Sequence, residues 1–287
     1  MRKLLFAFTA LTLGLTACQK EGSFENPNGS AGSGGGTTSG LLTRLVYAAG
    51  ADSIAMDFGY DGANRLISLS TTSTQDGNQV VKLYRNSSGI LTRYTTKSDE
   101  LTGLGLDSLV TDVSYDASRS KYAYSRSSIT LNGVTIVDST AFEYNSANNL
   151  VTKKSYAKGG PALYTIYAKT EYAYTGSNVV TEKNFSPGAT ADSWDPEYTY
   201  TYTYDDKTNP LKFGPEGLIA LTDFTLASAP YGSASNATKT DFVDHTDNNN
   251  NFSFTTAYTY SSSNKPSAGT ATLAPGPGGY QLRYYYK

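Results

Sequence analysis

Apolar and polar positions alternate along most of the chain beyond residue 40. The clearest run is residues 197–204, Glu-Tyr-Thr-Tyr-Thr-Tyr-Thr-Tyr. Successive side chains of a β-strand point to opposite faces, so this run predicts a strand with all its tyrosines on one face. Those tyrosines are Tyr198, Tyr200, Tyr202 and Tyr204. A helix is predicted only near residues 215–221, which follow an Asn-Pro pair. The chain is therefore predicted to be all-β.

The strand-like runs repeat, and each ends near a tyrosine. We align eight such positions: Tyr60, Tyr84, Tyr115, Tyr144, Tyr174, Tyr204, Tyr231 and Tyr260. From Tyr84 onward the steps between them are 27 to 31 residues. A regular period of this kind indicates a repeated supersecondary unit.

The residues after each tyrosine predict a tight turn. Asn or Gly lies four or five positions later in most units, as at Asn64, Gly89 and Asn148. Asp or Asn at a strand end can form an Asx-turn, and Asn or Gly then tolerates the left-handed conformation. Tyr115 is the exception, with Arg119 at the fourth position. About eight hairpins in sequence predict an extended antiparallel meander sheet, open or curled.

The N-terminal residues have a different pattern. Arg2 and Lys3 precede an apolar run, residues 4–15, that is too short to span a bilayer. The run closes on Leu15, Thr16, Ala17 and Cys18. Residues 18–40 carry few apolar side chains and include a Gly/Ser-rich stretch, so we expect a flexible tether with an r.m.s. span of about 25 Å. The predicted β domain is residues 41–287.

Two short motifs resemble known families. Leu15-Thr16-Ala17-Cys18 resembles the lipobox of bacterial lipoproteins. That resemblance implies that residues 1–17 are a signal peptide and that Cys18 is lipidated. It also implies a cell-envelope address held by a covalent lipid. Gln19 after the cysteine favours the outer membrane, at its periplasmic face or the cell surface.

The Tyr-Asp-x-x-x-Asn-x-Leu hairpins resemble a loose form of the YD repeats of RHS-type proteins. More closely, the chain is similar to uncharacterised Gram-negative envelope lipoproteins that combine a lipobox, a Gly/Ser tether and such hairpins. Their Asn-Pro-Leu/Phe-Lys insertion is matched by residues 209–212. This family implies no specific activity.

Composition narrows the classes of partner. Without residues 1–17 the chain holds 21 basic and 25 acidic residues and no basic cluster, so nucleic acid is not an expected partner. Cys18 is the only cysteine, which leaves no internal disulfide and no thiolate metal site. The oligomeric state stays open, although the free edges of an open sheet would favour a covering partner.

The tyrosine face of residues 197–204 has two interpretations. Tyrosine offers a large ring and a polar tip, so Tyr198, Tyr200, Tyr202 and Tyr204 could form a flat platform that binds glycans or another envelope protein. The same residues could instead provide cross-strand packing only.

The only histidine of the sequence lies within residues 244–251, where most of the other residues are Asp or Asn. Asp244 and Asp247 are weak candidate ligands for a structural calcium ion. A polar hairpin tip explains the same residues without metal, and no other cofactor is expected.

No catalytic constellation is evident, so an enzyme is not expected. A carboxylate-dependent glycoside hydrolase is the least favoured alternative. A lipid-embedded barrel is not expected either, because polar residues fill one face of most strands. The sequence favours a lipid-anchored envelope β protein that acts as a scaffold or binding surface. The alternative is a purely structural or assembly lipoprotein without a ligand.

Overall fold

The computed structural model describes residues 40–75, 77–131, 133–190, 192–221, 228–276 and 278–287. Strands dominate these residues. The first eight are β1 (Leu42–Ala49), β2 (Asp52–Tyr60), β3 (Leu66–Ser73), β4 (Gly77–Arg85), β5 (Leu91–Ser98), β6 (Leu109–Asp116), β7 (Lys121–Leu131) and β8 (Val134–Tyr144). The next eight are β9 (Leu150–Gly159), β10 (Thr165–Thr175), β11 (Asn178–Pro187), β12 (Trp194–Thr208), β13 (Ser235–Asp244), β14 (Phe252–Tyr260), β15 (Pro266–Ala274) and β16 (Gly279–Tyr286). Short helices are α2 (Asp99–Gly103), α3 (Gly214–Ala220), α4 (Ala229–Gly232) and the 3-10 helix η2 (Asn248–Asn250).

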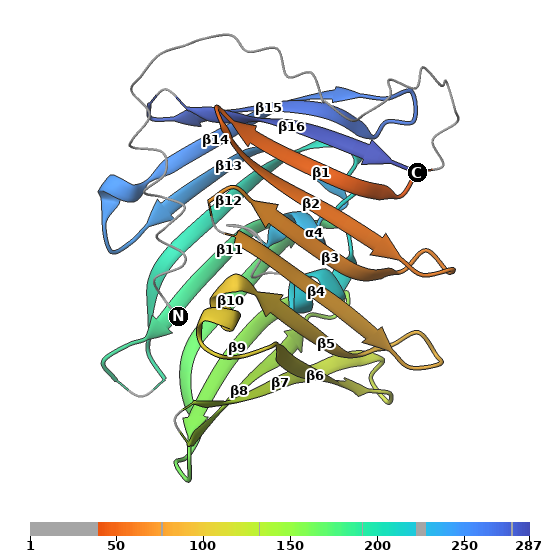
Figure 1. Ribbon diagram of the computed structural model, residues 1–287. Coiled ribbons are helices and arrows are strands. Elements are labelled where there is room, and N and C mark those ends of the chain that lie inside the picture. Colours follow the sequence, from red (N-terminus) through yellow and green to blue (C-terminus); the bar gives the residue numbers. More distant parts are fainter. Residues whose placement is uncertain (1–39, 76, 132, 191, 222–227, 277) are drawn as a thin grey trace.

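The strands form a closed barrel (Figure 1). Each strand pairs antiparallel with the next one along the chain, and β16 pairs with β1, where Leu45 lies opposite Tyr284 and Tyr47 opposite Leu282. The predicted all-β class and neighbour order are confirmed, but the predicted open or curled sheet is wrong. In an open sheet the outward edges of β1 and β16 would have unpaired backbone N–H and C=O groups. Closure pairs these groups with each other.

The barrel has two distinct ends. One holds the turns after β2, β4, β6, β8, β10 and β14, and we call it the tyrosine end because each even-numbered strand carries a tyrosine at or near its end there. Gly40 and Lys287 lie at this end, which is on the right in Figure 1. The opposite end, with α2 and η2, is called the far end.

The turns at the tyrosine end follow the sequence pattern. Asn64, Asn148 and Asn264 have positive φ angles of 61°, 65° and 57°. Asp61 Oδ1 accepts hydrogen bonds from the Ala63 and Arg65 amides, both at 2.9 Å, which is an Asx-turn. The predicted turn chemistry is confirmed. In the unit of Tyr115, Ser120 takes the left-handed position with φ 53°.

The repeated tyrosine marks a β-bulge. The register shifts by a residue beside the tyrosine in seven strand pairs, between Gly59/Tyr60, Tyr84/Arg85, Ser114/Tyr115, Glu143/Tyr144, Ala173/Tyr174, Thr203/Tyr204 and Thr259/Tyr260. A bulge re-aims the side chain at that position. The Tyr60 and Tyr174 hydroxyls then donate to the carbonyls of Leu42 and Leu150, both at 2.9 Å, which are the first residues of the preceding strands. The tyrosine repeat is therefore a strand-end contact.

One predicted repeat position is wrong. Tyr231 does not end a strand but lies in α4 with 1% of its surface exposed. The eighth strand-end tyrosine is Tyr286. The two steps on either side of Tyr231 contain a single hairpin and an insertion after β12, and we call its described residues, 209–221 and 228–234, the plug. The predicted helix near residues 215–221 is confirmed by α3.

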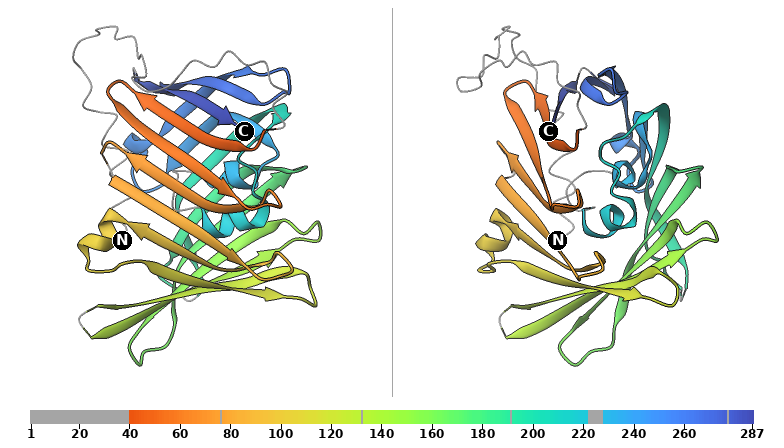
Figure 2. Two further views of the ribbon diagram at one scale, coloured as in Figure 1. Left: turned by 45° about the vertical axis from the view of Figure 1, so that its right-hand side comes forward. Right: turned by 90° about the vertical axis from the view of Figure 1, so that its right-hand side faces the viewer.

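The plug lies inside the barrel, where Figure 2 shows α3 and α4 enclosed by the wall. The buried apolar side chains gather around it and include Leu218 and Leu221 of the plug and Phe58 and Leu150 of the wall. Among the described residues, no helix is long and apolar enough to cross a membrane.

Polar side chains predominate on the outer face of the wall, with exposed apolar ones such as Val110 and Val243 among them. Cross-strand ion pairs lie on it, including Arg93–Asp112 at 2.7 Å and Lys154–Glu143 at 2.7 Å. A lipid-embedded barrel instead carries an outward apolar band. The polar face noted in the sequence is thus the outside of the barrel, and the apolar face is its interior.

Candidate functional site

An ion pair between a nearly buried arginine and a partly exposed glutamate fixes α3 of the plug to the wall. Arg85 of β4 contacts Glu216 through two hydrogen-bonded nitrogens, Nη2–Oε2 at 2.6 Å and Nη1–Oε1 at 2.7 Å. The Tyr122 hydroxyl of β7 also donates to Glu216. Burial alone would lower the pKa of Arg85, but the hydrogen bond and charge of Glu216 raise it. The Arg85 guanidinium therefore keeps its charge beside Glu216.

A buried carboxylate fixes the other side of the plug. Glu182 of β11, only 6% exposed, accepts hydrogen bonds from the Ser228 hydroxyl at 2.8 Å and the Ser228 amide at 3.2 Å. The Tyr202 hydroxyl donates to the same oxygen at 3.2 Å. Tyr172 and Ser228 share a further hydrogen bond of 3.0 Å. These contacts satisfy the carboxylate inside the barrel.

Aromatic packing completes the plug contact. Phe213 stacks on Phe58 of β2, with ring centroids 5.9 Å apart, and lies 6.1 Å from Tyr231. Lys153 of β9 donates from Nζ to the Leu218 carbonyl at 3.3 Å, near the C-terminal end of α3. The plug therefore packs against several sides of the wall near the tyrosine end.

Toward the far end, the inner wall carries a continuous row of rings that we call the aromatic arc. Its members are Tyr47, Tyr280, Phe254, Phe252, Phe242 and Tyr198. Their neighbouring ring centroids lie 4.7 to 5.9 Å apart. All six side chains are partly exposed although they face inward. Barrels of sixteen strands are generally too wide for wall side chains alone to fill them.

The four predicted platform tyrosines occupy this wall. Tyr200 lies opposite Glu182 and Phe242, so the alternation has placed the tyrosines on one shared face, as predicted. That face is the interior of the barrel and not a flat outer surface. Tyr200 and Tyr202 are 2% and 4% exposed, whereas Tyr198 and Tyr204 are partly exposed. Of the four, only Tyr198 belongs to the aromatic arc.

The sequence reasoning missed the phenylalanines of the arc. Phe242, Phe252 and Phe254 flank the polar run at residues 244–251. The oxygen-bearing side chains of that run suggested a metal site or a polar turn, and the neighbouring rings were not considered. The Phe-Ser-Phe alternation at 252–254 was the available signal for an inward-facing strand.

Across the barrel the inner wall is lined by hydroxyl groups. Inward-facing, partly exposed members are Thr96, Thr140, Ser155 and Thr170. Thr140 and Ser155 share a hydrogen bond of 3.0 Å between their hydroxyls. The far half of the interior thus has an aromatic side and a hydroxyl side.

The candidate calcium residues lie at the end of β13 (Asp244) and in the loop after it (Asp247). Asp244 Oδ1 accepts from the Thr246 hydroxyl at 2.6 Å and from the Thr246 and Asp247 amides, and Oδ2 accepts from Asn250 at 3.0 Å. Burial alone would raise the pKa of Asp244, but the hydrogen bonds from Thr246, Asn250 and Asp247 lower it to about 2. Within the described residues, no group of three or more His, Cys, Asp or Glu side chains could hold a metal ion.

The lipidation motif, Leu15 to Cys18, lies outside the described residues, as does most of the predicted tether.

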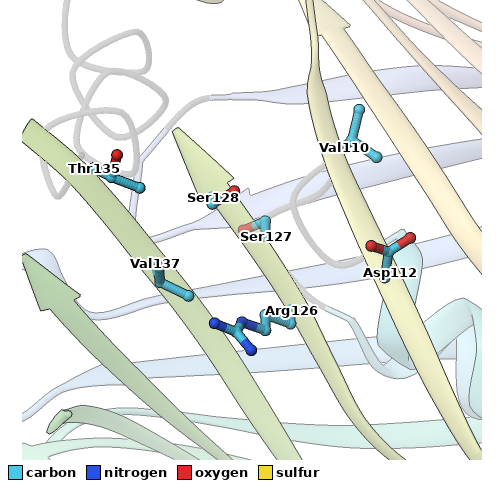
Figure 3. A pocket seen from close by; sticks show the side chains of 7 residues that line it. All are labelled: Val110, Asp112, Arg126, Ser127, Ser128, Thr135 and Val137. Carbon is cyan, nitrogen blue, oxygen red and sulfur yellow. The ribbon is translucent and has the colours of Figure 1, made fainter. Parts of the chain in front are cut away.

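A hollow on the outer face is lined by residues of β6, β7 and β8, and Figure 3 shows Val110, Asp112, Arg126, Ser127, Ser128, Thr135 and Val137 around it. Asp112 is the single carboxylate among these lining residues, and it pairs with Arg93. A second hollow lies at the tyrosine end. Glu216, which pairs with Arg85, is the only carboxylate among its lining residues. Neither offers the pair of carboxyls that glycoside hydrolysis requires.

Comparison with known proteins gives a likeness of fold. A porin-like protein from Bacteroides uniformis matches with a TM-score of 0.52 at 12% identity, over 86% of this chain and 98% of that one. A porin-like protein from Bacteroides vulgatus matches with a TM-score of 0.49 at 10% identity, over the same shares of the two chains. No protein-family model matches the sequence. No curated protein matches it either.

Proposed function

We propose that this chain is a lipid-anchored envelope protein whose plugged, water-soluble barrel binds a glycan on its inner wall. The observation that carries the proposal is the aromatic arc, because its rings face inward, contact one another and stay partly exposed. Aromatic faces stack on the apolar faces of sugar rings, and a hydroxyl-lined wall opposite them can exchange hydrogen bonds with sugar hydroxyls.

The polar outer face supports a binding protein rather than a membrane-spanning pore. Charged and hydroxyl side chains cover the outside, and the plug is held at two sites inside the tyrosine end. A purely structural or assembly role is the alternative. It would need the tyrosine contacts and the plug but no accessible aromatic surface.

The lipid anchor and the glycan site are tested separately on the full chain. Cys18→Ala is expected to abolish palmitate labelling and membrane retention, and labelling of that variant would contradict the anchor. The detergent-extracted lipoprotein is then applied to a glycan array. Tyr198→Ala and Phe254→Ala are expected to lower binding at least tenfold, because each removes a partly exposed ring of the arc.

Tyr285→Ala is the matched control, since Tyr285 is 46% exposed and lies between the inward-facing Tyr284 and Tyr286 on the outside of β16. Its binding is expected to equal that of the wild type. Absence of glycan binding at millimolar ligand, or equal losses in all three variants, would overturn the luminal site and favour the structural role.

A further inference from the structure

Charge is distributed unequally between the two ends of the barrel. At the far end, the described acidic residues are Asp52, Asp99, Glu100, Asp107, Asp192, Asp195, Glu197, Asp244 and Asp247. The described lysines there are Lys97, Lys158 and Lys169, whose ammonium lies 4.8 Å from the centroid of the Trp194 ring, and His245 lies at the same end. The far end therefore carries a strong negative charge.

The tyrosine end is basic by comparison. Its described cations are Arg65, Arg119, Lys121, Lys207, Lys212, Lys265 and Lys287, besides the buried Arg85. Its acids are Asp61, Asp116, Glu143, Asp205, Asp206 and Glu216, of which Glu143 pairs with Lys154 on the outer face. Three of them are neutralised by ion pairs at the same end: Asp61 with Arg65, Asp206 with Lys207, and Glu216 with Arg85.

The chain enters the barrel at the tyrosine end. The Lys287 amide donates to the Leu41 carbonyl at 3.2 Å, and Lys265 Nζ donates to the Gly40 carbonyl at 2.5 Å. Cys18 precedes Gly40 by 22 residues in the sequence, so the proposed anchor joins the described chain at this end. The far end lies farther away by a strand length, since the 11 residues of β8 extend about 36 Å.

We propose that the tyrosine end is a docking face for an anionic lipid surface, with the far end directed away from it. The inference rests on the lipid anchor proposed above. Basic residues near an anionic surface are attracted to it within about a Debye length of ~10 Å, and acidic residues are repelled. Attraction of the tyrosine end and repulsion of the far end favour the same orientation.

This orientation places the plug between the membrane and the luminal site. The aromatic arc then opens toward the aqueous phase, where a glycan can enter without crossing the lipid surface. The tether alone would allow many orientations, and the charge distribution selects one of them.

The orientation is tested by energy transfer between a labelled cysteine and a lipid-headgroup acceptor, using the full lipoprotein in vesicles. Because the only native cysteine is Cys18, an introduced cysteine is the only free thiol once Cys18 is lipidated. Ser262→Cys reports the tyrosine end and Ala162→Cys the far end, and both positions are exposed. In vesicles with a third phosphatidylglycerol, transfer from Ser262→Cys is expected to exceed that from Ala162→Cys several-fold. In pure phosphatidylcholine the difference is expected to shrink.

Charge-reversal pairs provide the matched control. Arg119→Glu with Lys212→Glu alters the docking face, and Lys97→Glu with Lys158→Glu makes the same change in net charge at the far end. The first pair is expected to reduce the difference in transfer about fivefold, and the second to preserve or increase it.

Equal transfer from both positions in a palmitate-labelled protein would overturn the docking face and leave the anchor standing. The same loss from both reversal pairs would also overturn it, because net charge alone would then be responsible. Absence of palmitate would overturn the anchor and the docking face together.

Discussion

At the scale of single residues, the fold depends on a few backbone positions at the tyrosine end. Asn148 is exposed and has a φ of 65°, a conformation that costs other residues energy. Its amide donates to the Asn145 carbonyl at 3.1 Å, and Asn145 Oδ1 accepts from the Ala147 and Asn149 amides at 3.0 Å. The turn is therefore determined locally, which is why its residues could be recognised from sequence.

Asn148→Ala is expected to destabilise the barrel by about 1 kcal/mol, because alanine disfavours the left-handed region. Asn148→Gly is expected to cost little. The free energy of unfolding in urea measures both effects, with Ser146→Ala as the exposed control in the same turn. A stability of Asn148→Ala equal to that of Asn148→Gly would contradict the backbone explanation.

At the scale of elements, the plug is the feature that sequence periodicity concealed. Its length is close to one repeat, and Tyr231 falls near the expected position, so it imitates a hairpin unit. Only its contacts reveal what it is. Arg85 and Glu182 come from distant strands, and no local pattern predicts that they meet Glu216 and Ser228.

Glu216→Ala is expected to destabilise the protein by about 3 kcal/mol, because the Arg85 side chain is only 9% exposed and would be left without its counter-ion. Replacing both residues with leucine is expected to recover most of the loss. Urea unfolding measures the free energies, and hydrogen exchange of the α3 amides shows whether the plug loosens.

Glu143→Ala is the matched control, since Glu143 pairs with Lys154 on the exposed outer face. That change is expected to cost less than about 1 kcal/mol. Similar losses from Glu216→Ala and Glu143→Ala would contradict the role of the Arg85–Glu216 pair in holding the plug.

At the scale of the whole molecule, closure of the barrel turns one face of every strand toward the interior. Many of the side chains that face this interior are tyrosines. The sequence holds 24 tyrosines. Burial raises the pKa of Tyr60 and of Tyr280 to about 12, and it raises the pKa of Tyr202 well above the ordinary value, with Glu182 adding to the shift.

These shifts predict alkaline unfolding. A tyrosine whose pKa is higher in the folded state than in the unfolded state contributes stability that is complete below about pH 10. That stability is lost as the pH rises from about 10 through about 12. Near-ultraviolet absorbance should show buried tyrosines ionising together with loss of the β-sheet circular dichroism signal. Ionisation of all tyrosines near pH 10 with an intact signal would contradict this.

The sequence by itself determined the local structure: strands from alternation, turns from Asp, Asn and Gly after each tyrosine, α3 after Asn-Pro, and a shared face for Tyr198 and Tyr200. These features depend on neighbouring residues and on the twofold period of a strand. Tertiary structure decided the rest. Pairing of β16 with β1 joins residues more than 230 positions apart and closed the sheet. Closure then decided which face became the interior, where the plug packs and where the aromatic arc lies, because alternation distinguishes two faces without saying which one is inside.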